Sequence, residues 1–258
     1  MTKLGHVWPI AVHTVREAIR NKLLYTLLAF SVLVIAAAVV IASLSYVEGH
    51  RIIQDIGLAS IRLFSLGIAV FVGVGLIHGE VERRTIYVIL SKSVSRADFL
   101  LGKFLGLLLT VWLQVGLMAL AFGAVSLCTG APLDGGHALA LLLIAGELIV
   151  LVALATFFSS FTTPMLASLF TLGIWAAGQL SRDLLALAQQ GDDPRLVTVA
   201  RVLHRTLPDL ASFDLTLQAV HGLPIAASEV GLPLLYGAGY ASVLLIAAVA
   251  VFQRRDLK

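Results

Sequence analysis

The chain has 258 residues, of which 59% are hydrophobic and only 13% are charged. Its mean hydropathy is +0.97, and its apolar residues are gathered in long runs, which excludes an ordinary soluble domain with an apolar share of about 45–50%. The net charge of +3 comes without a basic patch interleaved with aromatic residues, so we expect no nucleic-acid partner. Cys128 is the single cysteine, which excludes an intramolecular disulfide.

Residues 7–21 are predicted to form a basic amphipathic helix. Trp8, Val12, Val15 and Ile19 recur at helical spacing, and charged residues such as Arg16 lie on the other faces. A helix of this kind typically lies in the plane of the membrane interface. We therefore expect an elbow helix along the inner surface of the bilayer. The alternative is a short stub that only precedes the first span.

The long apolar runs predict an all-α polytopic membrane protein with six transmembrane helices. A hydrocarbon layer about 30 Å thick requires about 20 mainly apolar residues in a helix. Six stretches meet or approach this length: Leu23–Ser43, Gly57–Ile77, Phe104–Leu127, Ala138–Phe158, Pro164–Leu180 and Leu232–Phe252. The sequence shows no internal repeat or linker, so residues 1–258 are expected to form a single transmembrane domain.

The distribution of Lys and Arg predicts the orientation of these spans. With both termini in the cytoplasm, the inner segments hold most of the basic residues, as the positive-inside rule requires. These residues are Lys3, Arg16, Arg20, Lys22, Arg83, Arg84, Lys92, Arg96, Lys103, Arg254, Arg255 and Lys258. The remaining long loop, residues 181–231, then lies outside, where we expect one or two short helices on the outer membrane face, broken by Pro208 and Pro224. No cleavable signal is expected at the N-terminus.

A charged segment, Gly79–Lys103, separates the second and third predicted spans. Within it, Ile86, Tyr87 and Leu90 are apolar anchors. Basic residues surround these anchors (Arg84, Lys92 and Arg96), and Glu80 and Glu82 precede them. An apolar centre with a polar rim is typical of a protein docking site. The alternative is a generic positively charged inner loop.

Two charges fall inside the predicted spans. Glu147 lies near the middle of the fourth span, where an ionised group is costly unless it faces protein or water. Arg62 lies near the outer end of the second span, close enough to the surface to snorkel. In one reading the two residues form a buried pair or part of a substrate path, with Gln114 and Gln179 as further polar candidates. In the other, Arg62 reaches the headgroups, and Glu147 is protonated or hydrogen-bonded.

Motifs for independent chemistry are missing from the sequence. A phosphate-binding loop would need a glycine at Ala97 and a hydroxyl residue after Lys103, and neither is present. The four histidines predicted outside (His50, His137, His204 and His221) are spaced too irregularly to indicate a metal site. We therefore expect no catalytic residue, no metal and no cofactor bound by this chain.

The order of these elements resembles the permease subunit of an ABC transporter of the ABC-2 type, over nearly the whole chain. The most specific part is EVERRTIYVILSKSVSR (Glu80–Arg96), followed by ADFLLGK (Ala97–Lys103). It is similar to the family pattern ExExxTIxxLLSKPxSRxxxLxGK, with Ser93 in place of the frequent proline. REAIRNKLLY (Arg16–Tyr25), LPDLASFDL (Leu207–Leu215) and FQRRD (Phe252–Asp256) also match. The last two look more like the branch linked to multicopper enzyme and nitrous oxide reductase maturation.

The resemblance implies a division of labour. A separate ATP-binding subunit would bind ATP and Mg²⁺, and two copies of this chain would form the pathway in the bacterial inner membrane, most often for export. Residues Arg84–Ser95, with Thr85, would form the coupling helix that docks on the ATPase, flanked by Arg96. An accessory periplasmic protein could bind loop 181–231, and membrane lipid would surround the spans. Two other functions remain open: a membrane anchor that recruits a soluble complex, and an ion-coupled carrier that uses Glu147 and Arg62.

Overall fold

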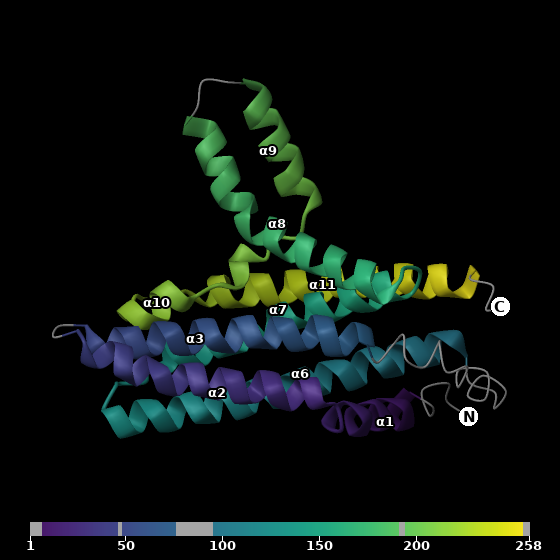
Figure 1. Cartoon of the computed structure of the whole chain (residues 1–258). Helices are drawn as coiled ribbons and strands as arrows, with labels where there is room; N and C mark the ends of the chain where they lie inside the picture. The colour runs from purple at the N-terminus through teal and green to yellow at the C-terminus, as the bar shows by residue number, and fades with distance from the viewer. Residues whose placement is uncertain (1–6, 46–47, 76–94, 191–193, 255–258) are drawn as a thin grey trace.

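The computed structural model describes residues 7–45, 48–75, 95–190 and 194–254, and these ranges form helices and connections without a β-strand. The helices are α1 (Val7–Ile19), α2 (Lys22–Ser43), α3 (Gly49–Gly67) with the π-helical turn η2 (Ile68–Val72), α6 (Arg96–Thr129), α7 (Gly135–Ser159), α8 (Pro164–Gln190), α9 (Pro194–Thr206), the 3-10 turn η3 (Ala211–Phe213), α10 (Thr216–His221) and α11 (Ala227–Arg254). Most of them run side by side in one bundle (Figure 1).

Five of the described helical stretches are long and apolar enough to cross a membrane: Lys22–Ser43, Gly49–Gly75, Arg96–Thr129, Gly135–Ser159 and Ala227–Gln253. They coincide with five of the six predicted spans. The remaining predicted span, Pro164–Leu180, is the first part of α8, which is not among the five. The all-helical class is therefore confirmed, and the count of six spans stays a prediction.

The predicted outer loop between the first two spans is shorter than expected, because α3 already begins at Gly49. The first turns of α3 are polar on one side only. Ile53, Gly57, Leu58 and Ile61 still recur at helical spacing and are buried. Average hydropathy does not detect such an amphipathic start, which explains the error in the predicted boundary.

Local signals fix several helix ends. Ser95 and Asp98 form a reciprocal capping box at the start of α6, where the Ser95 hydroxyl accepts a hydrogen bond from the Asp98 backbone at 3.0 Å. Gly130, with φ of 70°, ends the same helix in the left-handed conformation that glycine adopts without strain. Asp134 caps α7 in the same way as Ser95 caps α6.

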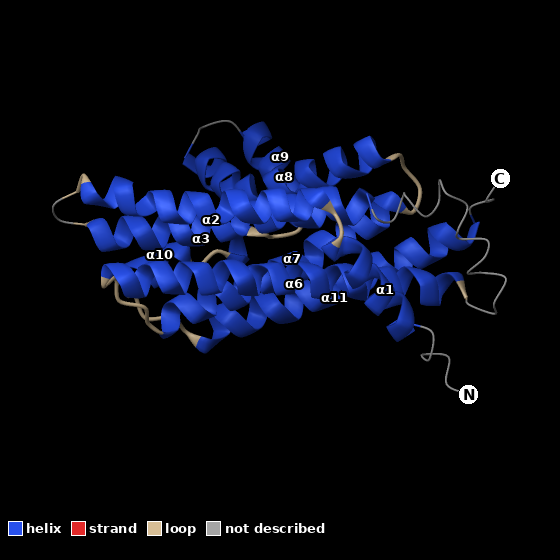
Figure 2. Cartoon of the chain, turned by 60° about the horizontal axis from the view of Figure 1, so that its bottom comes forward, coloured by secondary structure: helices blue, strands red, loops and turns tan. Residues whose placement is uncertain are grey.

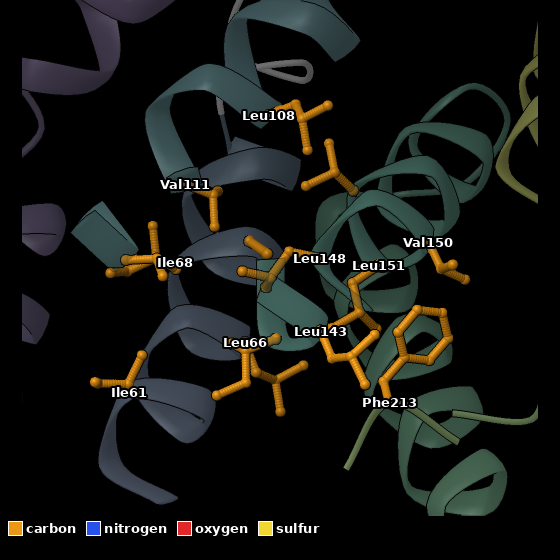
Figure 3. Packing of buried hydrophobic residues seen from close by; sticks show 14 of the residues in the cluster. Ile61, Leu66, Ile68, Leu108, Val111, Leu143, Leu148, Val150, Leu151 and Phe213 are labelled. Carbon is orange, nitrogen blue, oxygen red and sulfur yellow. The ribbon is translucent and has the colours of Figure 1, made fainter. Parts of the chain in front are cut away.

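α7 is the central helix of the bundle. In its most apolar stretch 67% of the residues are buried inside the protein, compared with 22% in α2 and 17% in α11. Branched aliphatic side chains of α3, α6 and α7 interdigitate around it, together with Phe213 (Figure 3). α2 and α11 therefore leave most of their apolar surface for lipid or another protein.

The two ends of the bundle are defined by contacts between distant segments. At the end that we call the Arg96 end, the guanidinium group of Arg96 donates to the carbonyl oxygens of Phe252 (3.2 Å) and Gln253 (3.0 Å), at the end of α11. At the opposite Pro132 end, the side-chain amide of Gln54 in α3 donates to the carbonyl oxygen of Pro132 at 2.5 Å. The start of α6 and the end of α11 thus lie at the same end of the molecule (Figure 1).

α1 packs along the first half of α6 at the Arg96 end. Its buried residues are Val7, Ala11, Thr14 and Ala18. The predicted apolar stripe lies on other faces of the helix, where Trp8 is 63% exposed. The helix predicted over residues 7–21 is therefore present as α1, and its position in the membrane interface stays a prediction.

α8 leaves the bundle obliquely, and its second half pairs with α9. The two helices form a hairpin that projects away from the long helices in both views (Figures 1 and 2). The break before Pro208 was predicted correctly, because α9 ends at Thr206. We call the two described arms of this projection, Leu180–Gln190 of α8 and Pro194–Thr206 of α9, the α8–α9 hairpin.

Candidate functional site

Charged side chains from three distant parts of the chain meet on one side of α7. Arg62 comes from α3, Glu147 from the middle of α7, and Asp214 from the turn between η3 and α10. The Arg62 Nε atom donates to Glu147 Oε2 at 2.8 Å. One terminal nitrogen of Arg62 donates to Asp214. Arg62 therefore bridges two carboxylates and does not snorkel toward the membrane surface.

Hydrogen bonds, in addition to the ion pair with Arg62, hold the Glu147 side chain in place. Its other carboxylate oxygen accepts hydrogen bonds from the Trp175 indole at 2.9 Å and from the Gln179 amide at 2.8 Å. Trp175 and Gln179 lie four residues apart on α8, so they share one face of that helix. Because the Glu147 side chain is only 2% exposed, these donors replace the water that an ionised carboxylate would otherwise need.

Asp214 is the outer member of the cluster, with 40% of its side chain exposed. Partial burial raises the pKa of Asp214, but the positive charge of Arg62 and the hydrogen bond from the Thr216 backbone outweigh it, so the pKa lies below the ordinary 3.8. Asp214 is therefore ionised at neutral pH. The second terminal nitrogen of Arg62 is buried and has no hydrogen-bond partner among the described residues.

Two pockets lie along α8, and they share no lining residue. One, of about 520 Å³, lies beside this cluster, and its lining combines Asp55, Arg62, Gln179 and Asp214 with apolar side chains. The other, of about 450 Å³, is almost wholly apolar and lies near the start of α8, where Phe71 of η2 contributes to its lining. We call the first pocket the α3–α8 groove, and Arg62 and Asp214 form its charged part.

A model of the family described as "ABC-2 family transporter protein" matches residues 8–257. The chain belongs to this family. No curated protein sequence matches the chain. As an ABC-2 family transporter protein with several helices of membrane-spanning length, the chain is a multi-pass membrane permease of an ABC transporter. A permease of this family is a membrane subunit and not an enzyme in its own right.

In this ABC-2 permease, only part of the predicted site lies within the described residues. Most of the predicted coupling segment lies outside them: Glu80, Glu82, Arg84, Thr85, Ile86, Tyr87, Leu90 and Lys92. Arg96 is described and is bonded to the end of α11. Gln114 of α6 is buried, its amide nitrogen has no partner among the described residues, and no contact joins it to the Arg62 cluster.

The structure adds Asp214 and Trp175 to the two charges that the sequence indicated, and it brings to them Gln179, which the sequence had already indicated as a polar candidate. Asp214 belongs to LPDLASFDL, which the family resemblance had already singled out, although no spacing argument connects it with Arg62. Trp175 lies in an apolar run, where tryptophan is ordinary. The only available signal was the four-residue spacing between Trp175 and Gln179.

Proposed function

We propose that this ABC-2 permease is an exporter subunit of the bacterial inner membrane, with both termini in the cytoplasm. It forms a homodimer and is driven by ATP hydrolysis in a separate ATP-binding subunit, which holds ATP and Mg²⁺. This chain binds no cofactor and no nucleic acid. The single observation that carries the proposal is the family match over residues 8–257.

Transmission of motion from the ATPase is proposed to begin in residues Arg84–Ser95. This segment leads directly into α6, whose start is fixed on two sides. Arg96 binds the end of α11, and the Lys103 ammonium lies 3.2 Å from the carboxylate of Glu17 in α1. A displacement of the segment would therefore move α6 together with α1 and α11.

The decisive experiment is co-purification of the ATPase with variants of the coupling segment. Tyr87→Asp and Leu90→Asp remove apolar anchors and are expected to abolish binding of the ATP-binding subunit. Ser91→Asp adds the same charge to the same segment without removing an anchor, and should leave binding intact. Unchanged co-purification with both anchor variants would refute the docking assignment, provided that all proteins elute as folded particles of equal size.

We further propose that the substrate path includes the α3–α8 groove, with Arg62 and Asp214 at its charged part and Glu147 paired with Arg62. In a background in which Cys128 is replaced by serine, Leu63→Cys should report on this groove. Its reaction with a maleimide should change when the complex is trapped with ATP and vanadate. Equal labelling in both states would argue against a moving path at this position.

The buried pair between Arg62 and Glu147 also suits the second candidate function, an ion-coupled carrier, because such carriers depend on intramembrane charges. Transport that continues without ATP but stops when the ion gradient is collapsed would favour the carrier. A stable complex with a soluble partner that moves nothing would favour a membrane anchor. Within the loop 181–231, residues 207–226, which follow α9, are the proposed contact for an accessory periplasmic protein.

A further inference from the structure

The α8–α9 hairpin exposes apolar side chains that no described part of the chain covers. On α8, Leu180, Leu184 and Leu187 are between 46% and 64% exposed. On α9, Leu196, Val199, Val202 and Leu203 are between 41% and 59% exposed. Single exposed leucines are ordinary on a protein surface, but three on one face of α8 and four along its partner helix α9 indicate a contact surface.

The base of the hairpin is fixed, so its direction is set by the fold. The guanidinium group of Arg182 donates to Asp209 at 3.1 Å. At Gly178 the two backbones come close together, because an added Cβ would lie 2.6 Å from the carbonyl oxygen of Pro208. Above this base the hairpin projects crosswise to the long helices (Figure 1). In a membrane that these helices cross, the hairpin therefore runs along the membrane rather than through it.

α9 has the composition of a membrane-surface helix. It is strongly amphipathic but has low overall hydrophobicity, which distinguishes it from a spanning helix. Its sequence contains Arg195, Arg201 and Arg205 and neither Asp nor Glu. Arg201 is exposed, on a different side of α9 from the exposed Leu196 and Val199.

The charge pattern decides between a lipid surface and a second copy of the chain. A symmetric contact through α9 would bring positively charged helices together, which costs free energy. Anionic headgroups have the complementary charge, and each Lys or Arg near such a surface contributes about 1 kcal/mol. We propose that the α8–α9 hairpin is a lipid-binding element that inserts its leucine and valine side chains among acyl chains and holds anionic headgroups through Arg201.

Spin labels at single cysteines test this proposal. In the Cys128→Ser background, labels are placed at Val199 and Leu187, with Leu120→Cys (72% exposed on α6) as the lipid-facing reference and Gln189→Cys as the solvent-facing reference. The protein is held in nanodiscs of phosphatidylcholine with or without phosphatidylglycerol. Collision rates with oxygen and with a water-soluble nickel chelate are then compared.

If the hairpin binds lipid, the labels at Val199 and Leu187 should match Leu120 in their preference for oxygen over nickel. Arg201→Glu should shift Val199 toward nickel in discs that contain phosphatidylglycerol, and Arg201→Lys should not. Two results would overturn the proposal. Labels that match Gln189 would show that the surface is open to solvent and free for a soluble partner. Labels that are shielded from both reagents, with spectra broadened by a neighbouring label, would show that a second copy of the chain covers the surface. Because no ATPase or substrate is involved, this result is independent of the proposed transport.

Discussion

Among the described side chains, Glu147 combines deep burial with an ion pair and two further hydrogen-bond donors. Burial of two charges is costly, and their attraction repays that cost only when the remaining polar atoms are satisfied. Both oxygens of Glu147 meet this condition. Arg62 meets it less fully, since one of its terminal nitrogens has no partner. The Arg62 guanidinium can therefore donate one more hydrogen bond to an acceptor.

Removal of one member of the buried pair should be much more harmful than removal of an exposed one. Glu147→Ala leaves the Arg62 guanidinium with Asp214 alone, and we expect a loss of about 3–5 kcal/mol in the free energy of unfolding. Glu48→Ala is the matched control, because Glu48 pairs with Arg51 at the surface, where both side chains are about half exposed; it should cost at most about 1 kcal/mol.

Unfolding in mixed detergent with increasing SDS measures both values. Similar losses for the two variants would show that Glu147 is not held as described. The double variant Arg62→Met with Glu147→Leu should recover only part of the stability. An apolar pair avoids the cost of desolvating two charges, but Trp175, Gln179 and Asp214 lose a hydrogen-bond partner.

The ion pair between Arg62 and Asp214 should stabilise the protein at neutral pH and lose this effect only at acidic pH. The pKa of the Asp214 carboxyl is below 3.8 in the folded protein. The stabilisation that Arg62 gives to Asp214 is therefore fully present above the pKa that Asp214 has in the unfolded chain. It is lost as the pH falls through the pKa of the folded state. The difference in thermal midpoint between the wild type and Asp214→Asn should be constant from about pH 7 to about pH 5 and should shrink below the ordinary carboxyl range. A difference that already declines near neutral pH would contradict this assignment.

The sequence could predict this site only in part. Arg62 and Glu147 were conspicuous, because charges are rare in apolar runs. Their pairing could not be read from the sequence, since the two residues are 85 positions apart and belong to helices whose neighbours are set by tertiary packing. Asp214 reaches the cluster from a short turn outside the spans, where an aspartate is unremarkable.

At the scale of the helix, periodicity and apolar length were reliable for the spans, and they failed where a helix is amphipathic. α3 begins before its apolar part, and the packed face of α1 consists of small residues rather than the large apolar ones that attract attention. Small residues indicate close packing only when a partner helix is known. Gly102 and Gly106 of α6 show this, since they lie against α1.

The contact between α1 and α6 should be sensitive to a single methyl group. At Gly106 an added Cβ would lie 2.6 Å from the carbonyl oxygen of Ala11 and 2.5 Å from the Thr14 Cβ. Gly106→Ala must therefore displace α1, at a cost of about 1–3 kcal/mol. Gly116→Ala in the same helix meets no atom within 4 Å and should stabilise the protein by about 0.5–1 kcal/mol.

Thermal unfolding of both glycine variants in one detergent provides the measurement. The midpoint of thermal unfolding should fall for Gly106→Ala and rise for Gly116→Ala. If Gly106→Ala also stabilises the protein, α1 is not packed on α6 as described.

At the scale of the whole molecule, the directions of the helices impose a condition on the sixth span. α7 ends near the Arg96 end of the bundle, whereas α11 starts toward the Pro132 end and finishes beside Arg96 (Figure 1). Residues 160–226 must therefore carry the chain back toward the Pro132 end. In that region, the first part of α8, from Pro164 to the start of the hairpin at Leu180, is the described helical stretch that runs back in this direction (Figure 1). It approaches the length required by a hydrocarbon layer of about 30 Å.

We therefore predict that α8 crosses the membrane, although its polar residues keep it out of the five clear spans. In the Cys128→Ser background, a membrane-impermeant maleimide added to spheroplasts should label Leu44→Cys and Leu223→Cys. Phe161→Cys and Gln253→Cys should react only after lysis. If α8 does not cross, Phe161→Cys and Leu223→Cys will react from the same side, and Gln253→Cys will then react from the side of Leu44→Cys. Five spans would separate the termini, so Leu223→Cys and Gln253→Cys distinguish the two topologies, while Leu44→Cys and Phe161→Cys serve as references for the outer and inner sides.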